Sequence, residues 1–192
     1  HFEAAARLTQ LEGGRDRTFD VRHNLAQVLL DLGDIEAAAP VIEDVLSKWP
    51  DRGEDSETPS KLLLEGRLLA AQGEHAAAAA RFRAALEGTP LFDYEVELET
   101  RLGDALDALG RTDEARDAYE RGLARLEEAR TAIDLDRFKS GLLRRAREAY
   151  EALFLLHLRE GRPVLAAEVV ERAKGRTFVE AFARSGDVYV EP

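Results

Sequence analysis

One short pattern recurs four times in this chain of 192 residues: a glycine, an alanine five residues later, and a bulky side chain four residues beyond the alanine. Apolar residues spaced three and four apart flank each glycine, which is the spacing of a buried helix face. Each copy therefore predicts two amphipathic helices joined at a glycine. The copies are Gly33, Ala38 and Ile42; Gly73, Ala78 and Phe82; Gly110, Ala115 and Tyr119; and Gly161, Ala166 and Val170.

The first copy shows how such a turn is built. Gly33 can adopt the left-handed backbone conformation that ends many helices. Asp34 follows, and its carboxylate can cap the next helix by accepting backbone N–H bonds. Pro40 is expected in the first turn of that helix, where a missing N–H costs little. The sequence thus predicts helices over about 20–32 and about 35–48.

The copies divide the chain into repeats of unequal length. We expect a leading half repeat over 1–14, repeats over 19–50, 59–90, 93–132 and 138–184, an acidic loop over 51–58, and a linker or the start of a following domain over 185–192. The last repeat is longer because its first helix is expected over about 138–159. Its second helix is expected over about 164–183, and Ser185 and Gly186 are expected to end it.

Composition excludes several classes of function. Hydrophobic residues make up 45% of the chain, which is enough for a substantial core, and there is no cysteine for a disulfide, a thiolate metal site or a nucleophile. No metal-ligand spacing, phosphate-binding loop or GxSxG motif occurs. We therefore expect no catalytic residue, no metal and no cofactor. A net charge of −11 disfavours nucleic acid as a partner.

The location of the protein is inferred from what the sequence lacks. It has no apolar run of roughly 18 residues and no signal peptide, which predicts a cytoplasmic protein that does not enter a membrane. It starts at His1 and contains no methionine. We therefore expect it to be part of a longer protein, and we expect that protein to be bacterial.

The repeat resembles the tetratricopeptide repeat, a helix-turn-helix unit of about 34 residues with glycine at the turn and a small residue on the second helix. The resemblance covers nearly the whole chain and implies an all-α fold, a right-handed tetratricopeptide superhelix of about four repeats plus a leading half. The residues that carry it are Leu25, Ala26, Leu29, Gly33, Ala38, Ile42, Val45 and Pro50, and Leu102, Gly103, Leu106, Gly110, Ala115, Tyr119 and Gly122.

The last repeat resembles a narrower group. The stretch AEVVERAKGRTFVEAF is similar to the final repeat that precedes the caspase-like protease domain of TPR-CHAT proteins. This implies that Glu171, Arg172, Lys174 and Arg176 lie at a junction with a following domain, with which the repeats could make an intramolecular contact. The histidine and cysteine of such a protease would lie beyond residue 192, so this chain is not expected to be an enzyme.

Tetratricopeptide solenoids bind protein or peptide partners mainly along the concave face that their first helices line. Carried over by position, the resemblance places twelve residues on that face: His23, Gln27 and Asp31; Leu63, Arg67 and Ala70; Thr100, Asp104 and Asp107; and Glu151, Leu155 and Arg159. A clamp for a peptide carboxylate is not expected, because these positions offer Arg67 as the one strong cation of the first two repeats.

Two pairs of alternatives stay open at the level of sequence. The first pair concerns a basic run that follows the acidic third repeat and consists of Arg137, Lys139, Arg144, Arg145 and Arg147. Either the run and the acidic repeat are solvated faces that attract each other, or the run is a docking patch for an acidic partner or RNA. The chain is a regulatory interaction module that controls a downstream CHAT-type protease, or a stand-alone assembly scaffold or chaperone adaptor.

Overall fold

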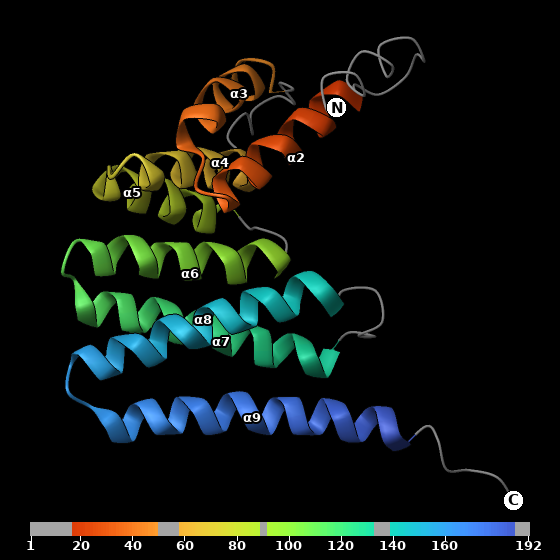
Figure 1. Cartoon of the computed structure of the whole chain (residues 1–192), viewed down its shortest axis with the longest axis vertical. Helices are drawn as coiled ribbons and strands as arrows, with labels where there is room; N and C mark the ends of the chain where they lie inside the picture. The colour runs from red at the N-terminus through yellow and green to blue at the C-terminus, as the bar shows by residue number, and fades with distance from the viewer. Residues whose placement is uncertain (1–16, 50–57, 89–91, 133–138, 187–192) are drawn as a thin grey trace, which may run out of the picture.

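The computed structural model describes residues 17–49, 58–88, 92–132 and 139–186 (Figure 1). These ranges contain eight α-helices and no strand, which confirms the all-α prediction. The helices are α2 (Arg17–Asp31), α3 (Ile35–Ser47), α4 (Pro59–Ala71), α5 (His75–Glu87), α6 (Phe92–Ala108), α7 (Thr112–Ala132), α8 (Lys139–Arg159) and α9 (Pro163–Gly186). The expected half repeat at 1–14 and most of the acidic loop lie outside the described residues.

The helices form four antiparallel pairs that stack from α2 at one end to α9 at the other (Figure 1). Each helix packs against its neighbours in sequence. The first helices of successive pairs also contact one another, α2 with α4, α4 with α6, and α6 with α8. This arrangement is an α-α solenoid, in which one face is built from the first helices.

All four predicted turn glycines have the left-handed conformation, with φ between 69° and 84°. At the first turn, the Gly33 N–H donates to the Leu30 carbonyl at 3.1 Å, and the Asp34 N–H donates to the Leu29 carbonyl at 3.0 Å. This pair of bonds defines a Schellman cap and recurs at the other three glycines. Asp34 also accepts from the Ala37 N–H at 3.1 Å, which confirms the predicted N-cap.

Pro40 corrects one expectation. Because Asp34 fixes the start of α3 at Ile35, Pro40 is the sixth residue of the helix and lies in its interior. Intrahelical bonding has already begun there, since the Ala38 N–H donates to the Asp34 carbonyl at 2.9 Å. Pro40 therefore leaves the Glu36 carbonyl without its helical donor.

The end of the last helix also differs from the prediction of about residue 183, because α9 continues through Ser185 to Gly186.

Two clusters of buried side chains form the core. The smaller cluster joins α2, α3 and α4 around Ile42, and the larger one runs from α4 to α9. Helix α4 belongs to both: Leu64 and Leu68 enter the smaller cluster, whereas Leu62 and Leu63 enter the larger. The first helix pair is thus attached to the rest through one face of α4.

Glycines inside first helices make room for aromatic rings on second helices. A Cβ atom built on Gly66 would lie 2.4 Å from Cε1 of Phe82, and one on Gly103 would lie 2.4 Å from Cε1 of Tyr119. Both rings are almost wholly buried. A glycine therefore sets how closely each of these two helix pairs approaches.

We expect Gly66→Ala to lower the free energy of unfolding by about 1–3 kcal/mol, although alanine is the better helix former, because the new methyl group overpacks against Phe82. Chemical denaturation followed by circular dichroism measures the change. Gly88→Ala is the matched control, because its Cβ would make ordinary contacts no closer than 3.5 Å. Adding Phe82→Leu should recover part of the loss. Equal stabilities of the Gly66→Ala and Gly88→Ala variants would contradict the overpacking.

Candidate functional site

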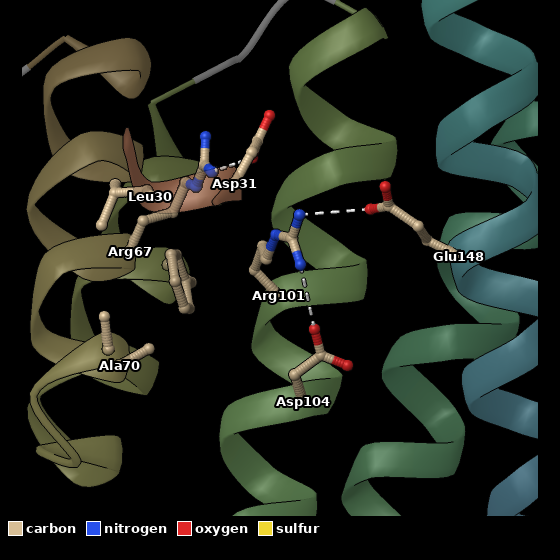
Figure 2. A pocket seen from close by; sticks show the side chains of 9 residues that line it. Leu30, Asp31, Arg67, Ala70, Arg101, Asp104 and Glu148 are labelled. Atoms are coloured by element: carbon tan, nitrogen blue, oxygen red, sulfur yellow. Dashed lines mark hydrogen bonds and ion pairs between the residues drawn. The ribbon is translucent and has the colours of Figure 1, made fainter. Parts of the chain in front are cut away.

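A pocket of about 530 Å³ opens between successive first helices (Figure 2). Helices α2, α4, α6 and α8 all contribute to its wall. Helix α5, the second helix of its pair, contributes the ring of Phe82. The pocket therefore lies on the face that the repeat architecture assigns to partners. Its lining residues are Leu30, Asp31, Arg67, Ala70, Ala71, Phe82, Arg101, Asp104 and Glu148.

Arg67 links three helices at one end of the pocket. Its guanidinium donates to Asp31 of α2 at 2.5 Å and lies 3.8 Å from Glu97 of α6. Glu97 also accepts from Arg145 of α8 at 3.1 Å. Because Arg67, Glu97 and Arg145 are largely buried, these pairs are screened less by salt than surface pairs are. They hold the first helices at fixed spacing.

Arg101 occupies the other end of the pocket, between two carboxylates (Figure 2). Its guanidinium donates to Glu148 of α8 at 3.1 Å and to Asp104 of its own helix at 3.5 Å. The second oxygen of Asp104 accepts from the Tyr119 hydroxyl at 2.9 Å. Asp104 is therefore tied both to the groove and to the buried ring that fills the space beside Gly103.

At this end of the pocket, burial removes water from Asp104 and Tyr119 and shifts their pKa values. The surrounding pocket wall raises the pKa of Asp104, and Arg101 and the Tyr119 hydroxyl partly oppose this change, although 44% of the Asp104 side chain stays exposed. Burial and the adjacent Asp104 carboxylate raise the pKa of Tyr119, so its hydroxyl stays protonated and donates. Asp104 therefore accepts from two groups of the chain and still presents exposed carboxylate surface to the pocket.

The structure brings four of the twelve predicted groove residues into the pocket: Asp31, Arg67, Ala70 and Asp104. Three others, Asp107, Arg159 and Glu151, form ion pairs within the first helices or between them. Asp107 pairs with Arg159, and Glu151 lies 3.8 Å from Arg147. Leu155 is half exposed outside the pocket. Buried Leu63 belongs to the larger core cluster, and buried Thr100 donates to the Val96 carbonyl at 2.8 Å.

His23 and Gln27 contact each other, with their side-chain nitrogens 3.3 Å apart. The His23 ring also stacks on Phe19 and meets Trp49 edge-on, with centroids 6.1 and 5.6 Å away. Burial lowers the pKa of His23, although Asp20 opposes the change. The two residues therefore lie beside an aromatic cluster that closes the first helix pair, outside the pocket.

Sequence reasoning missed five lining residues: Leu30, Ala71, Phe82, Arg101 and Glu148. Arg101 and Glu148 each precede a predicted groove residue by three positions, so i, i+3 neighbours on the same helical face would have found them. Leu30 and Ala71 lie next to Asp31 and Ala70. No local pattern would have found Phe82, because its ring reaches the pocket through the space that Gly66 leaves open.

One side chain of the basic run faces an acidic residue of α6, since Arg145 pairs with Glu97. Arg147 instead lies near Glu151 of its own helix and is 71% exposed. The Arg145 contact favours faces that attract each other, and the Arg147 contact does not decide between the alternatives. Arg137 lies outside the described residues, and the side chains of Lys139 and Arg144 are not described.

The predicted junction residues lie on α9. Arg172 donates to Glu120 of α7 at 3.0 Å and lies 3.5 Å from Glu127, so it fastens α9 to the preceding pair. Lys174 donates to Glu171 one turn away at 3.1 Å. Arg176 belongs to the same helix, but its side chain is not among those described.

The part of the chain that the structure describes holds no group of three or more His, Cys, Asp or Glu residues that could bind a metal ion. His157 is buried, with Nδ1 3.6 Å from the Glu160 carboxylate. None of the described helices has both the length and the apolar character needed to cross a membrane.

Comparisons with known proteins agree with the repeat architecture. The sequence profile of the tetratricopeptide repeat matches residues 23–91 and 63–129, which together span more than half of the chain. A crystal structure of MamA superposes with a TM-score of 0.57 at 18% identity, covering 94% of this chain and 91% of that chain. Another MamA crystal structure gives 0.56 at 18% identity, covering 91% and 79%. This likeness shows the fold. No curated protein matches the sequence.

Proposed function

We propose that this chain, which belongs to the tetratricopeptide repeat family, is a non-catalytic interaction and regulatory module that holds a protein or peptide partner in the pocket on its first-helix face. Family membership supports a protein–protein interaction scaffold. The observation that carries the proposal is that four successive first helices supply side chains to a single pocket of about 530 Å³. That volume lies within the range of pockets that take small ligands, and it suits a short peptide segment.

The same contacts provide a route for regulation. A partner seated between α4 and α6 meets Asp31 and Asp104, the exposed carboxylates paired with Arg67 and Arg101, and both arginines bridge to neighbouring helices. Because each pair of a solenoid packs mainly on its neighbours, a change in these bridges passes along the stack as a small repacking of helices. The last described helix of the stack is α9, which Arg172 fastens to α7.

The regulated element in this proposal is a CHAT-type protease domain that follows the repeats. Its support is the resemblance of residues 167–182 to the last repeat before such domains, and the lengths of α8 and α9, with 21 and 24 residues. Reading the coding sequence beyond residue 192 tests it. A domain that supplies a histidine and a cysteine is expected. A stop codon or further repeats would leave a stand-alone assembly scaffold.

A plug in the pocket tests the binding role. We expect Ala71→Trp to fill space that a peptide needs and to weaken binding about tenfold or more, equivalent to about 1.4 kcal/mol. Peptides selected from a random library on the wild-type chain are the probe, and fluorescence anisotropy measures their affinity. Ala80→Trp adds the same side chain to an exposed site of α5 outside the pocket and should bind like the wild type.

Undiminished binding to the Ala71→Trp variant would contradict the groove assignment. Charge reversal at Asp104 or Asp107 is a poorer test, because these residues contact Tyr119 and Arg159 within the chain. Reversal would disturb the packing of α6 on α7 and α8 together with any bound peptide. The plug leaves those pairs in place.

A further inference from the structure

The charges that line the pocket are not equally available to a ligand. Arg67 keeps 10% of its side chain exposed and Arg101 keeps 25%. Asp31 and Asp104, the carboxylates beside them, keep 43% and 44%. A ligand that enters the pocket therefore meets carboxylate oxygens before it meets guanidinium groups.

The two arginines are also already engaged. Arg67 is held by Asp31 and Glu97, and Arg101 is held by Glu148 and Asp104. The Nε of Arg101 has no hydrogen-bond partner among the described residues, but it is buried, so a ligand cannot reach it without moving the helix. An anionic ligand would have to displace an existing carboxylate. A cationic ligand can add to the carboxylates while both arginines keep their partners.

The rest of the wall suits the stem of a long basic side chain. Leu30, Ala70 and Ala71 contribute apolar surface beside the charged groups, and the buried ring of Phe82 lies behind them. Lysine and arginine commonly lay their methylene stems on apolar surface while the charged head reaches a polar partner. The pocket offers both surfaces across neighbouring helices.

We propose that the pocket selects a partner that presents a lysine or arginine side chain, with its stem on the apolar wall and its charged head between Asp31, Asp104 and Glu148. This inference rests on the proposed function and adds the chemistry of the partner. The net charge of −11 draws a basic segment toward the chain from a distance. The exposed carboxylate of Asp104 in the pocket wall supplies a local contact for the head group.

Peptide selection on the intact chain tests the inference. Panning a random peptide library is expected to enrich peptides with lysine or arginine at one fixed position. Replacing that residue with glutamine should weaken binding about tenfold or more, since a hydrogen bond to a charged group contributes about 1.5–3 kcal/mol. Raising the salt concentration should weaken binding of the basic peptide to the wild-type chain and leave the affinity of the glutamine-substituted peptide nearly unchanged.

Isosteric variants locate the contact. Asp104→Asn and, separately, Glu148→Gln remove one charge and keep a group that accepts from Tyr119 or Arg101. Each should weaken the basic peptide about tenfold and leave the glutamine peptide unaffected. Asp117→Asn removes the same charge from an exposed site on α7 and should change nothing. Circular dichroism checks that each variant is folded. If one of the two variants does not fold, the other still tests the contact.

The outcomes separate this inference from the function beneath it. Selected peptides that lose affinity for Ala71→Trp but carry no basic residue, or carry an acidic one, would overturn the inference and leave the groove role standing. Peptides whose affinity is the same for Ala71→Trp would overturn both. A basic preference that persists in Asp104→Asn and Glu148→Gln would place the cation elsewhere and overturn the inference.

Discussion

Phe82→Ala is expected to lower the free energy of unfolding by about 3–5 kcal/mol, the usual cost of removing a buried aromatic ring from a core. The ring is fully buried, and it fills the space that Gly66 leaves on α4. Alanine would leave a cavity there, because the backbone of α4 and α5 cannot close a gap shaped around a ring. Chemical denaturation monitored by far-ultraviolet circular dichroism measures the loss.

Leu32→Ala is the control for this prediction. Leu32 is 75% exposed beside the first turn, so its removal should change the unfolding free energy by no more than about 0.5 kcal/mol. A loss below about 1 kcal/mol for Phe82→Ala would mean that the ring does not support the second helix pair. Because Phe82 also lines the pocket, the variant should lose peptide affinity even under conditions where it is folded.

The turns were the most predictable part of the fold because their cause is local. A left-handed residue must follow the last helical turn, and glycine adopts that conformation at least cost. Gly33, Gly73, Gly110 and Gly161 therefore mark the ends of first helices on sequence alone. Asp34 was predictable for the same reason, since a cap depends on residues within three positions of it.

Pro40 shows where local reasoning failed. The preference of proline for the first turn predicted a position that the cap at Asp34 rules out, and α3 continues past the proline with Ile42 and Val45 buried. Tertiary packing outweighs one lost hydrogen bond. The positional preference of proline alone therefore could not predict that packing would keep Pro40 inside the helix.

The pocket was predictable in outline and not in its charges. The resemblance to the tetratricopeptide repeat placed Asp31, Arg67, Ala70 and Asp104 on the first-helix face, and these four residues line the pocket. Whether Arg67 and Arg101 are available depends on partners far away in sequence, such as Glu148, which lies 47 residues from Arg101. Those pairings are set by how successive helices stack, and a single sequence does not record them.

The division of the core carries a consequence for unfolding. The first helix pair rests on a small cluster of buried residues from α2, α3 and α4, whereas α4 to α9 share a larger one. In a solenoid, stability is close to a sum of repeat stabilities and nearest-neighbour interfaces. The first pair should therefore open before the rest.

Ile42→Ala tests this division and should remove about 2–5 kcal/mol from the local stability of the first pair, since Ile42 is fully buried at the centre of the small cluster. Hydrogen exchange measured by mass spectrometry should show faster exchange in α2 and α3 and unchanged protection in α6 to α8. Leu153→Ala is the matched core variant in the larger cluster, and it should speed exchange in α8 and its neighbours and spare α2 and α3. If both variants instead speed exchange uniformly along the described helices, the solenoid unfolds as one cooperative unit. The narrow face of α4 would then transmit stability as effectively as the larger interfaces do.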